Sequence, residues 1–152
     1  MRLALLITHI RAEEKLLISA FQNAGVEPDI ILDRDLNIDL TSGPDQLAPS
    51  GTPWRDYDLV LERCVSTSRG MYMLAILERW GIRTLNSHAT AVVCADKLLT
   101  TLALAAARIP QPDTRVAFDT ESAMQAINDV GYPAVMKPVT GSWGRLLARV
   151  ND

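Results

Sequence analysis

Short apolar runs alternate with helical segments through the first 86 residues, and this alternation constrains the fold more than any other feature. Helical spacing is present over 12–24 and 70–80, each ending at a glycine. The apolar runs typical of strands lie at 3–8, 29–32, 58–61 and 82–85. Because parallel strands need long crossover connections, the pattern predicts an α/β fold, with a small doubly wound unit over 1–86.

The stretch between the second and third predicted strands lacks any periodicity. Residues 41–57 are rich in proline and glycine and are about as long as structureless loops become, so we expect a mobile or functional loop. Asp33, Arg34 and Asp35 precede it. Such a mixed-charge group is typical of a solvated surface, and no functional role is expected for it.

The second half of the chain predicts a different arrangement. We expect a short helix from Ser87, a helix capped by Asp96, a strand at 114–118, a helix at 121–130 and a hairpin at 133–150. Leu146, Leu147 and Ala148 are assigned to the second hairpin strand. One helix cannot cover such a sheet, so the second unit is expected to be incomplete.

The hairpin contains the sequence Lys137-Pro138-Val139-Thr140-Gly141-Ser142-Trp143-Gly144-Arg145. Glycines let backbone N–H groups approach a phosphate closely, and a lysine at the base adds positive charge. The hairpin therefore predicts a phosphate cradle. An ordinary hairpin is the alternative, because both G-x-x-x-x-G-K-[ST] and G-x-G-x-x-G are absent.

Lysine use supports the cradle. The chain has twelve arginines and three lysines, and two of the lysines occupy marked positions. Lys97 follows the capping residue Asp96, and Lys137 ends an apolar strand. A compact ammonium suits a crowded phosphate site. For each lysine, the alternative is a solvated surface position.

A second candidate site follows the third predicted strand, in Glu62-Arg63-Cys64-Val65-Ser66-Thr67-Ser68-Arg69-Gly70. In open α/β sheets, ligands bind at the carboxyl ends of strands. Ser66 and Ser68 offer hydroxyls near a helix N-terminus, and Arg69 can bind a carboxylate or phosphate. The alternative is an ordinary helix cap with Arg69 in solvent.

Composition excludes several classes of function. A net charge of -3 without a basic run argues against a nucleic-acid partner. The apolar N-terminus is too short to span a membrane and has no signal-peptide cleavage site, so we expect a cytoplasmic protein without a membrane partner. The cysteines and histidines do not form a metal-binding pattern. Oligomeric state is not readable, and a homo-oligomer remains compatible with the sequence.

Three stretches, 62–70, 86–97 and 137–147, together resemble the ATP-grasp ligases of the RimK-like group, in particular their LysX branch. The resemblance runs over essentially the whole chain. It implies a Rossmann-like preATP-grasp domain over 1–86 and the first part of an ATP-grasp domain over 87–152. One departure concerns Arg108, where the family usually has glycine in a helix cap.

The resemblance also implies roles for particular residues. Lys97 and Lys137 would contact ATP, and Ser66, Ser68 and Arg69 would shape the substrate end. A flexible loop closing over the phosphates would consist of Gly141, Ser142, Trp143, Gly144, Arg145, Leu146 and Leu147.

The implied activity joins α-aminoadipate or glutamate to the C-terminal glutamate of a small acidic amino-group carrier protein, LysW-like, through an acyl phosphate. ATP and Mg²⁺ would be required, and the metal ligands are expected beyond residue 152. No catalytic or metal-ligating residue is therefore expected within the chain, which should be inactive alone. The alternatives are a non-catalytic, truncated nucleotide- or partner-binding module and, less favoured, a nucleotide-dependent regulator.

Overall fold

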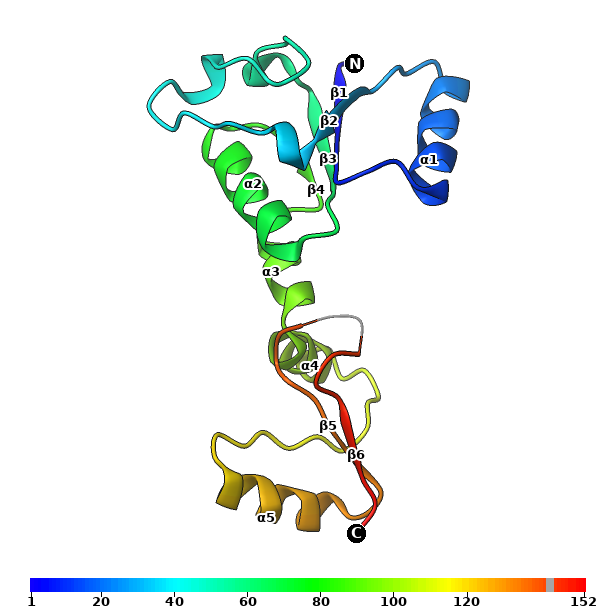
Figure 1. Cartoon of the computed structure of the whole chain (residues 1–152), viewed down its shortest axis with the longest axis vertical. Helices are drawn as coiled ribbons and strands as arrows, with labels where there is room; N and C mark the ends of the chain where they lie inside the picture. Colours follow the sequence, from blue (N-terminus) through cyan, green and yellow to red (C-terminus); the bar gives the residue numbers. More distant parts are fainter. Residues whose placement is uncertain (142–143) are drawn as a thin grey trace. The chain divides into compact units, whose positions relative to one another are not determined.

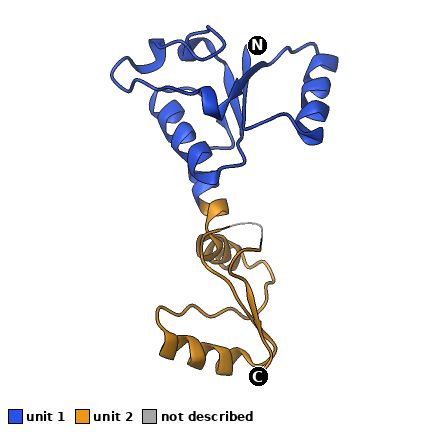
Figure 2. Ribbon diagram, in the orientation of Figure 1, with its two compact units in different colours: residues 1–92 blue, residues 93–152 orange. Residues whose placement is uncertain are grey.

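The computed structural model describes residues 1–141 and 144–152. The chain divides into two compact units, Met1–Val92 and Val93–Asp152 (Figure 2). The predicted boundary after residue 86 falls within the first unit.

A four-stranded parallel sheet forms the centre of the first unit. Its strands are β1 (Leu3–Ile7), β2 (Asp29–Leu32), β3 (Leu59–Arg63) and β4 (Thr84–Leu85), in the order β2-β1-β3-β4. All five residues of β1 are buried, because β1 pairs with β2 on one side and β3 on the other. A strand covered on both faces needs a continuous apolar run, which β1 has.

Two helices cover opposite faces of this sheet. α1 (Ala12–Asn23) connects β1 to β2, and α2 (Thr67–Arg79) connects β3 to β4 (Figure 1). Crossover connections are right-handed, and these two run in opposite directions along the sheet, so their helices must lie on opposite faces. The predicted doubly wound arrangement is confirmed. The strand order reverses between β1 and β3, and ligands bind at such a point in open sheets.

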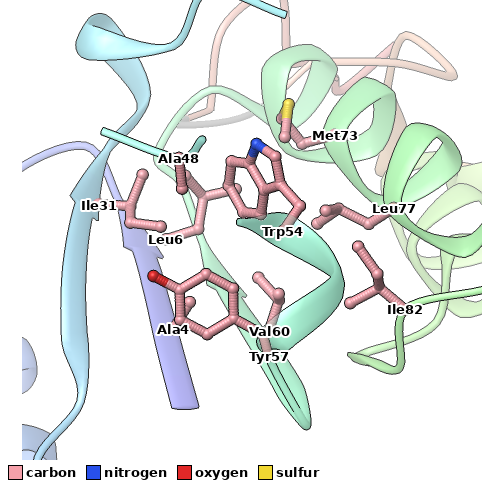
Figure 3. Packing of buried hydrophobic residues seen from close by; sticks show 10 residues of the cluster. All are labelled: Ala4, Leu6, Ile31, Ala48, Trp54, Tyr57, Val60, Met73, Leu77 and Ile82. Atoms are coloured by element: carbon pink, nitrogen blue, oxygen red, sulfur yellow. The ribbon is translucent and has the colours of Figure 1, made fainter. Parts of the chain in front are cut away.

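The long connection between β2 and β3, predicted to be mobile or functional, contributes side chains to the core, so the mobile alternative was wrong. It contains three short 3₁₀ turns and a bridge between Leu47 and Pro53. The side chains of Trp54, Tyr57 and Ala48 are buried against the sheet, beside residues of α2 (Figure 3). Aromatic side chains bury large apolar areas, which lets this segment cover the sheet without a long helix.

The second unit contains helices and a short hairpin, and α3 (His88–Ala95) leads into it. It comprises α4 (Lys97–Ala106), α5 (Thr120–Val130) and the antiparallel strands β5 (Ala134–Met136) and β6 (Ala148–Val150). Among the described residues of this unit, Ile127 and Ala134 are the buried hydrophobic ones.

Three details of the second unit differ from, or bear on, the sequence predictions. Residues 114–118 form no strand, so that prediction was wrong. Leu146 and Leu147 precede β6, because Leu146 has a left-handed backbone with φ of 58° that a strand cannot contain. Arg108 also has a left-handed backbone, with φ of 56°, where the family's glycine would be unstrained.

Within the described residues, each single helix is too short or too polar to cross a membrane. α3 and α4 satisfy the criteria of length and composition only as a pair, which is bent by 105°.

Candidate functional site

The carboxyl edge of the parallel sheet brings together the segments that follow β1, β2 and β3. The Thr8 hydroxyl donates a 2.9 Å hydrogen bond to Asp33 Oδ2. The same hydroxyl oxygen accepts a 2.9 Å hydrogen bond from the backbone N–H of Val65. Arg69 Nη1 lies 3.5 Å from Asp33 Oδ2. Residues distant in sequence therefore form one polar cluster at the point where the strand order reverses.

Ser66 caps α2, so this part of the helix-cap alternative is confirmed. Its hydroxyl accepts a 3.5 Å hydrogen bond from the backbone N–H of Arg69 and lies 3.3 Å from the Ser68 hydroxyl. The Arg69 side chain is 60% exposed and also reaches the Asp33 carboxylate, so it is not simply in solvent. The three predicted substrate-site residues lie together at the N-terminus of α2, with Ser66 as its cap.

Asp33 is the residue that sequence reasoning missed. We expected a solvated position, but its side chain is only 1% exposed. Its Oδ1 atom is buried and has no hydrogen-bond donor among the described residues. The available signal was its position directly after a buried strand, the same kind of position that drew attention to Ser66.

A second buried carboxylate, Glu14, lies beside this edge. Arg11 donates to it through Nε at 3.0 Å, Nη2 at 2.9 Å and its backbone N–H at 3.1 Å, and Arg63 Nη2 approaches at 3.3 Å. These bonds, chiefly those from the Arg11 side chain, lower the pKa of Glu14 to about 2 despite its burial. Glu14 is therefore charged at neutral pH and links the start of α1 to the end of β3 through its contacts with Arg11 and Arg63.

Glu62 and Gly70 fit closely together in the same region. Glu62 Oε1 accepts a 2.6 Å hydrogen bond from the backbone N–H of Cys64. A β-carbon at Gly70 would lie 2.3 Å from that oxygen, so glycine leaves the room that the carboxylate occupies. Burial, followed by the negative charge of Glu62, raises the pKa of the Cys64 thiol, which is consequently a poor nucleophile.

In the second unit, Lys97 lies against the connection between β5 and β6. Its backbone N–H donates a 2.9 Å hydrogen bond to the Val139 carbonyl, and its Nζ donates a 2.7 Å hydrogen bond to the Gly141 carbonyl. Asp96 caps α4 by accepting from the Leu99 N–H at 2.9 Å. The start of α4 and the Gly141 segment are thus held side by side.

The other predicted nucleotide-binding residues lie along the same connection. Lys137 directly follows β5 and is exposed. Gly141 and Gly144 both have left-handed backbones, with φ of 115° and 69°. Arg145, Leu146 and Leu147 complete the turn into β6 and are exposed, whereas Ser142 and Trp143 lie outside the described residues. Within the described ranges, there is no cluster of three or more metal-ligating side chains.

Comparisons with known proteins identify the first unit. Residues 3–93 match the LysX preATP-grasp domain. The chain is 34% identical over 152 residues to the glutamate–LysW ligase ArgX of Sulfolobus acidocaldarius, covering 100% of this chain and 50% of that protein. It is 34% identical over 142 residues to the α-aminoadipate–LysW ligase LysX of Saccharolobus solfataricus, covering 93% and 49%. The chain thus spans about half the length of these relatives.

Solved structures agree on the fold. A RimK domain ATP-grasp protein from Sphaerobacter thermophilus superposes with a TM-score of 0.80 at 34% identity, covering 100% of this chain and 54% of that one. The ATP-grasp ligase PsnB, solved with its minimal precursor, Mg and ADP, superposes with a TM-score of 0.68 over 98% of this chain and 57% of its own. At 18% identity, PsnB supports the fold alone.

Proposed function

The chain belongs to the LysX preATP-grasp domain family, and from this premise we propose that it forms part of an ATP-dependent ligase joining a carboxylate to an amine. The relatives named as ligases at 34% identity support this proposal. The amine substrate is a small acidic amino acid, α-aminoadipate or glutamate. The carboxylate belongs to a LysW-like carrier protein, as in the names of those relatives, and the reaction takes place in the cytoplasm.

The proposed reaction has two steps. A carboxylate oxygen attacks the γ-phosphorus of ATP, ADP leaves, and an acyl phosphate forms. The amine nitrogen then attacks the acyl carbon, phosphate leaves with its electron pair, the nitrogen loses a proton, and an amide remains. Protein groups contribute positioning and neutralisation of the phosphate charge in such reactions.

The contact between Lys97 and the Gly141 carbonyl is the observation that carries the nucleotide assignment. It places an ammonium beside a glycine-containing turn, which is the combination that a phosphate site requires. In the free chain, the Gly141 carbonyl oxygen occupies one donor of Lys97. A bound phosphate oxygen would compete for that donor, and Lys137 would supply a second positive charge from the same connection.

We propose Mg²⁺ as a requirement of the whole protein, as for the PsnB complex with Mg and ADP. The described part of this chain contains no metal-binding cluster, so no residue here is assigned to the metal. Its proposed contribution to the phosphate site is the two lysine side chains and the connection that contains Gly141 and Arg145.

The three lysines allow a matched test in the complete polypeptide that carries this sequence. We expect Lys97→Ala and Lys137→Ala to abolish or strongly weaken ATP binding, measured by calorimetry. Lys15→Ala removes the same charge from an exposed position on α1 and should leave binding unchanged. Equal ATP affinity in all three variants would refute the assignment. ATP binding without carrier-dependent ADP release would favour the non-catalytic module.

A further inference from the structure

The Asp33 carboxylate is incompletely satisfied in the free protein. Oδ2 accepts from the Thr8 hydroxyl and faces Arg69, but Oδ1 has no donor among the described residues. The Thr8 hydroxyl has one hydrogen, which Oδ2 already uses. Leaving a buried carboxylate oxygen unpaired is costly, and such an atom in a native protein calls for a partner such as a water molecule or a ligand.

Arg69 supplies the opposite charge at the same place. Its guanidinium has five N–H donors, and its contact with Asp33 at 3.5 Å is a long one. The side chain is 60% exposed, so much of it is accessible to a second anion. The first turn of α2, a 13-residue helix, also presents backbone N–H groups that lack partners within the helix. Arg69 and the N-terminus of α2 therefore favour an anionic group, and the adjacent Asp33 carboxylate favours a cationic group.

We propose that Asp33, Arg69 and the first turn of α2 bind the α-ammonium and α-carboxylate of a free amino acid. The ammonium donates to Asp33, including its unpaired Oδ1, and the carboxylate accepts from Arg69 and the helix N-terminus. The ammonium and the α-carboxylate of the bound amino acid give each member of the Asp33–Arg69 ion pair a new partner, and because their two charges cancel, they add no net charge at the pair. The inference rests on the proposed function, because this amino acid would be the amine substrate of the ligase.

The clearest test compares ligands that lack one charged group. L-glutamate and L-α-aminoadipate carry both groups, glutarate lacks the ammonium, and L-glutamic acid α-amide lacks the α-carboxylate. Binding to the unmodified protein is followed by calorimetry and by amide chemical shifts of Thr8, Asp33 and Ser66. We expect glutamate to bind about tenfold or more tightly than either analogue, as for hydrogen bonds between charged groups.

Two variants locate the charges. Asp33→Asn keeps the shape of the side chain and should weaken glutamate binding by about ten- to a hundredfold. It should not weaken glutarate binding, because glutarate has no ammonium to pair with Asp33. Arg69→Gln should weaken glutamate and glutarate but not the α-amide. Asp35→Asn and Arg34→Gln alter exposed neighbours of Asp33 in the same turn and serve as matched controls.

Several results would overturn the proposal. One is that neither amino acid binds at millimolar concentration. Another is that glutamate and glutarate bind with equal affinity, and a third is that Asp33→Asn leaves glutamate binding unchanged. Such a result would indicate that a water molecule satisfies Oδ1. The ligand series on the unmodified protein remains decisive even where a variant fails to fold. ATP binding, measured in the same samples, separates this inference from the nucleotide assignment, because Asp33→Asn should retain it and Lys137→Ala should lose it.

Discussion

Replacing Trp54 tests whether the connection between β2 and β3 is a true part of the core. Trp54 is fully buried between the sheet and α2 (Figure 3). A buried tryptophan removes about 200 Å² from water, which at about 25 cal/mol per Å² corresponds to roughly 5 kcal/mol. The compact unfolded chain and the methyl group that remains reduce this value. Measured Trp→Ala changes in cores cost about 3–5 kcal/mol, and we expect Trp54→Ala to fall in that range.

Trp54→Phe separates the apolar packing of the Trp54 ring from the cost of burying its indole N–H group. The indole Nε1 atom is buried without a hydrogen-bond partner among the described residues. Removing it relieves about 1–3 kcal/mol of desolvation cost, which offsets much of the packing lost with the smaller ring. We therefore expect Trp54→Phe to cost about half as much as Trp54→Ala, or roughly 1.5–2.5 kcal/mol less.

The assay is urea denaturation of the whole chain followed by far-UV circular dichroism, which does not depend on the substituted fluorophore. Leu47→Ala is the matched control, since Leu47 lies in the same connection but is 59% exposed. It should change the free energy of unfolding by about 0.5 kcal/mol or less. If Trp54→Ala is equally mild, the connection does not anchor the first unit, and our account of the core is wrong.

Two further predictions concern single residues. The pKa of Glu14 is lowered from 4.5 to about 2, so its stabilising contribution is complete above pH 4.5 and is lost as the pH falls toward 2. Between these pH values, the urea midpoint should therefore fall less steeply for Glu14→Gln than for the unmodified protein. Equal dependence of the two midpoints on pH would contradict the ion-pair argument. Arg108 has a left-handed backbone after α4, so Arg108→Gly should stabilise the protein by up to about 1 kcal/mol, measured by the same urea denaturation. Ala107→Gly is the control: Ala107 has a right-handed backbone, so this substitution should destabilise the protein.

The sequence predicted those features that depend on local pattern. The order of strands and helices in the first unit and the Asp96 cap follow from periodicity and capping chemistry, and the structure contains them. The juxtaposition of Lys97 with the Gly141 segment was expected only from the family resemblance, because no local rule pairs residues so far apart. Their binding of ATP stays a prediction.

Features that depend on tertiary contacts escaped prediction. Trp54 is buried because the sheet and α2 surround it, although its sequence neighbours are proline, arginine and aspartate. Residues 114–118 have strand propensity, but a strand also needs a neighbour with which to exchange backbone hydrogen bonds. The burial of Asp33 depends on Thr8 and Arg69, which its position after a strand does not reveal by itself.

The unequal distribution of buried side chains has a consequence for biosynthesis. The first unit holds nearly all the described core, whereas Phe118 is 93% exposed and Leu146 is 86% exposed in the second. Ribosomes release the N-terminal part first, so β1 to β4 can assemble while later residues are still being added. We expect chaperone contacts and early proteolytic cuts to concentrate after Val92, where little apolar burial opposes local opening. We therefore expect the first unit to reach its folded state before the second.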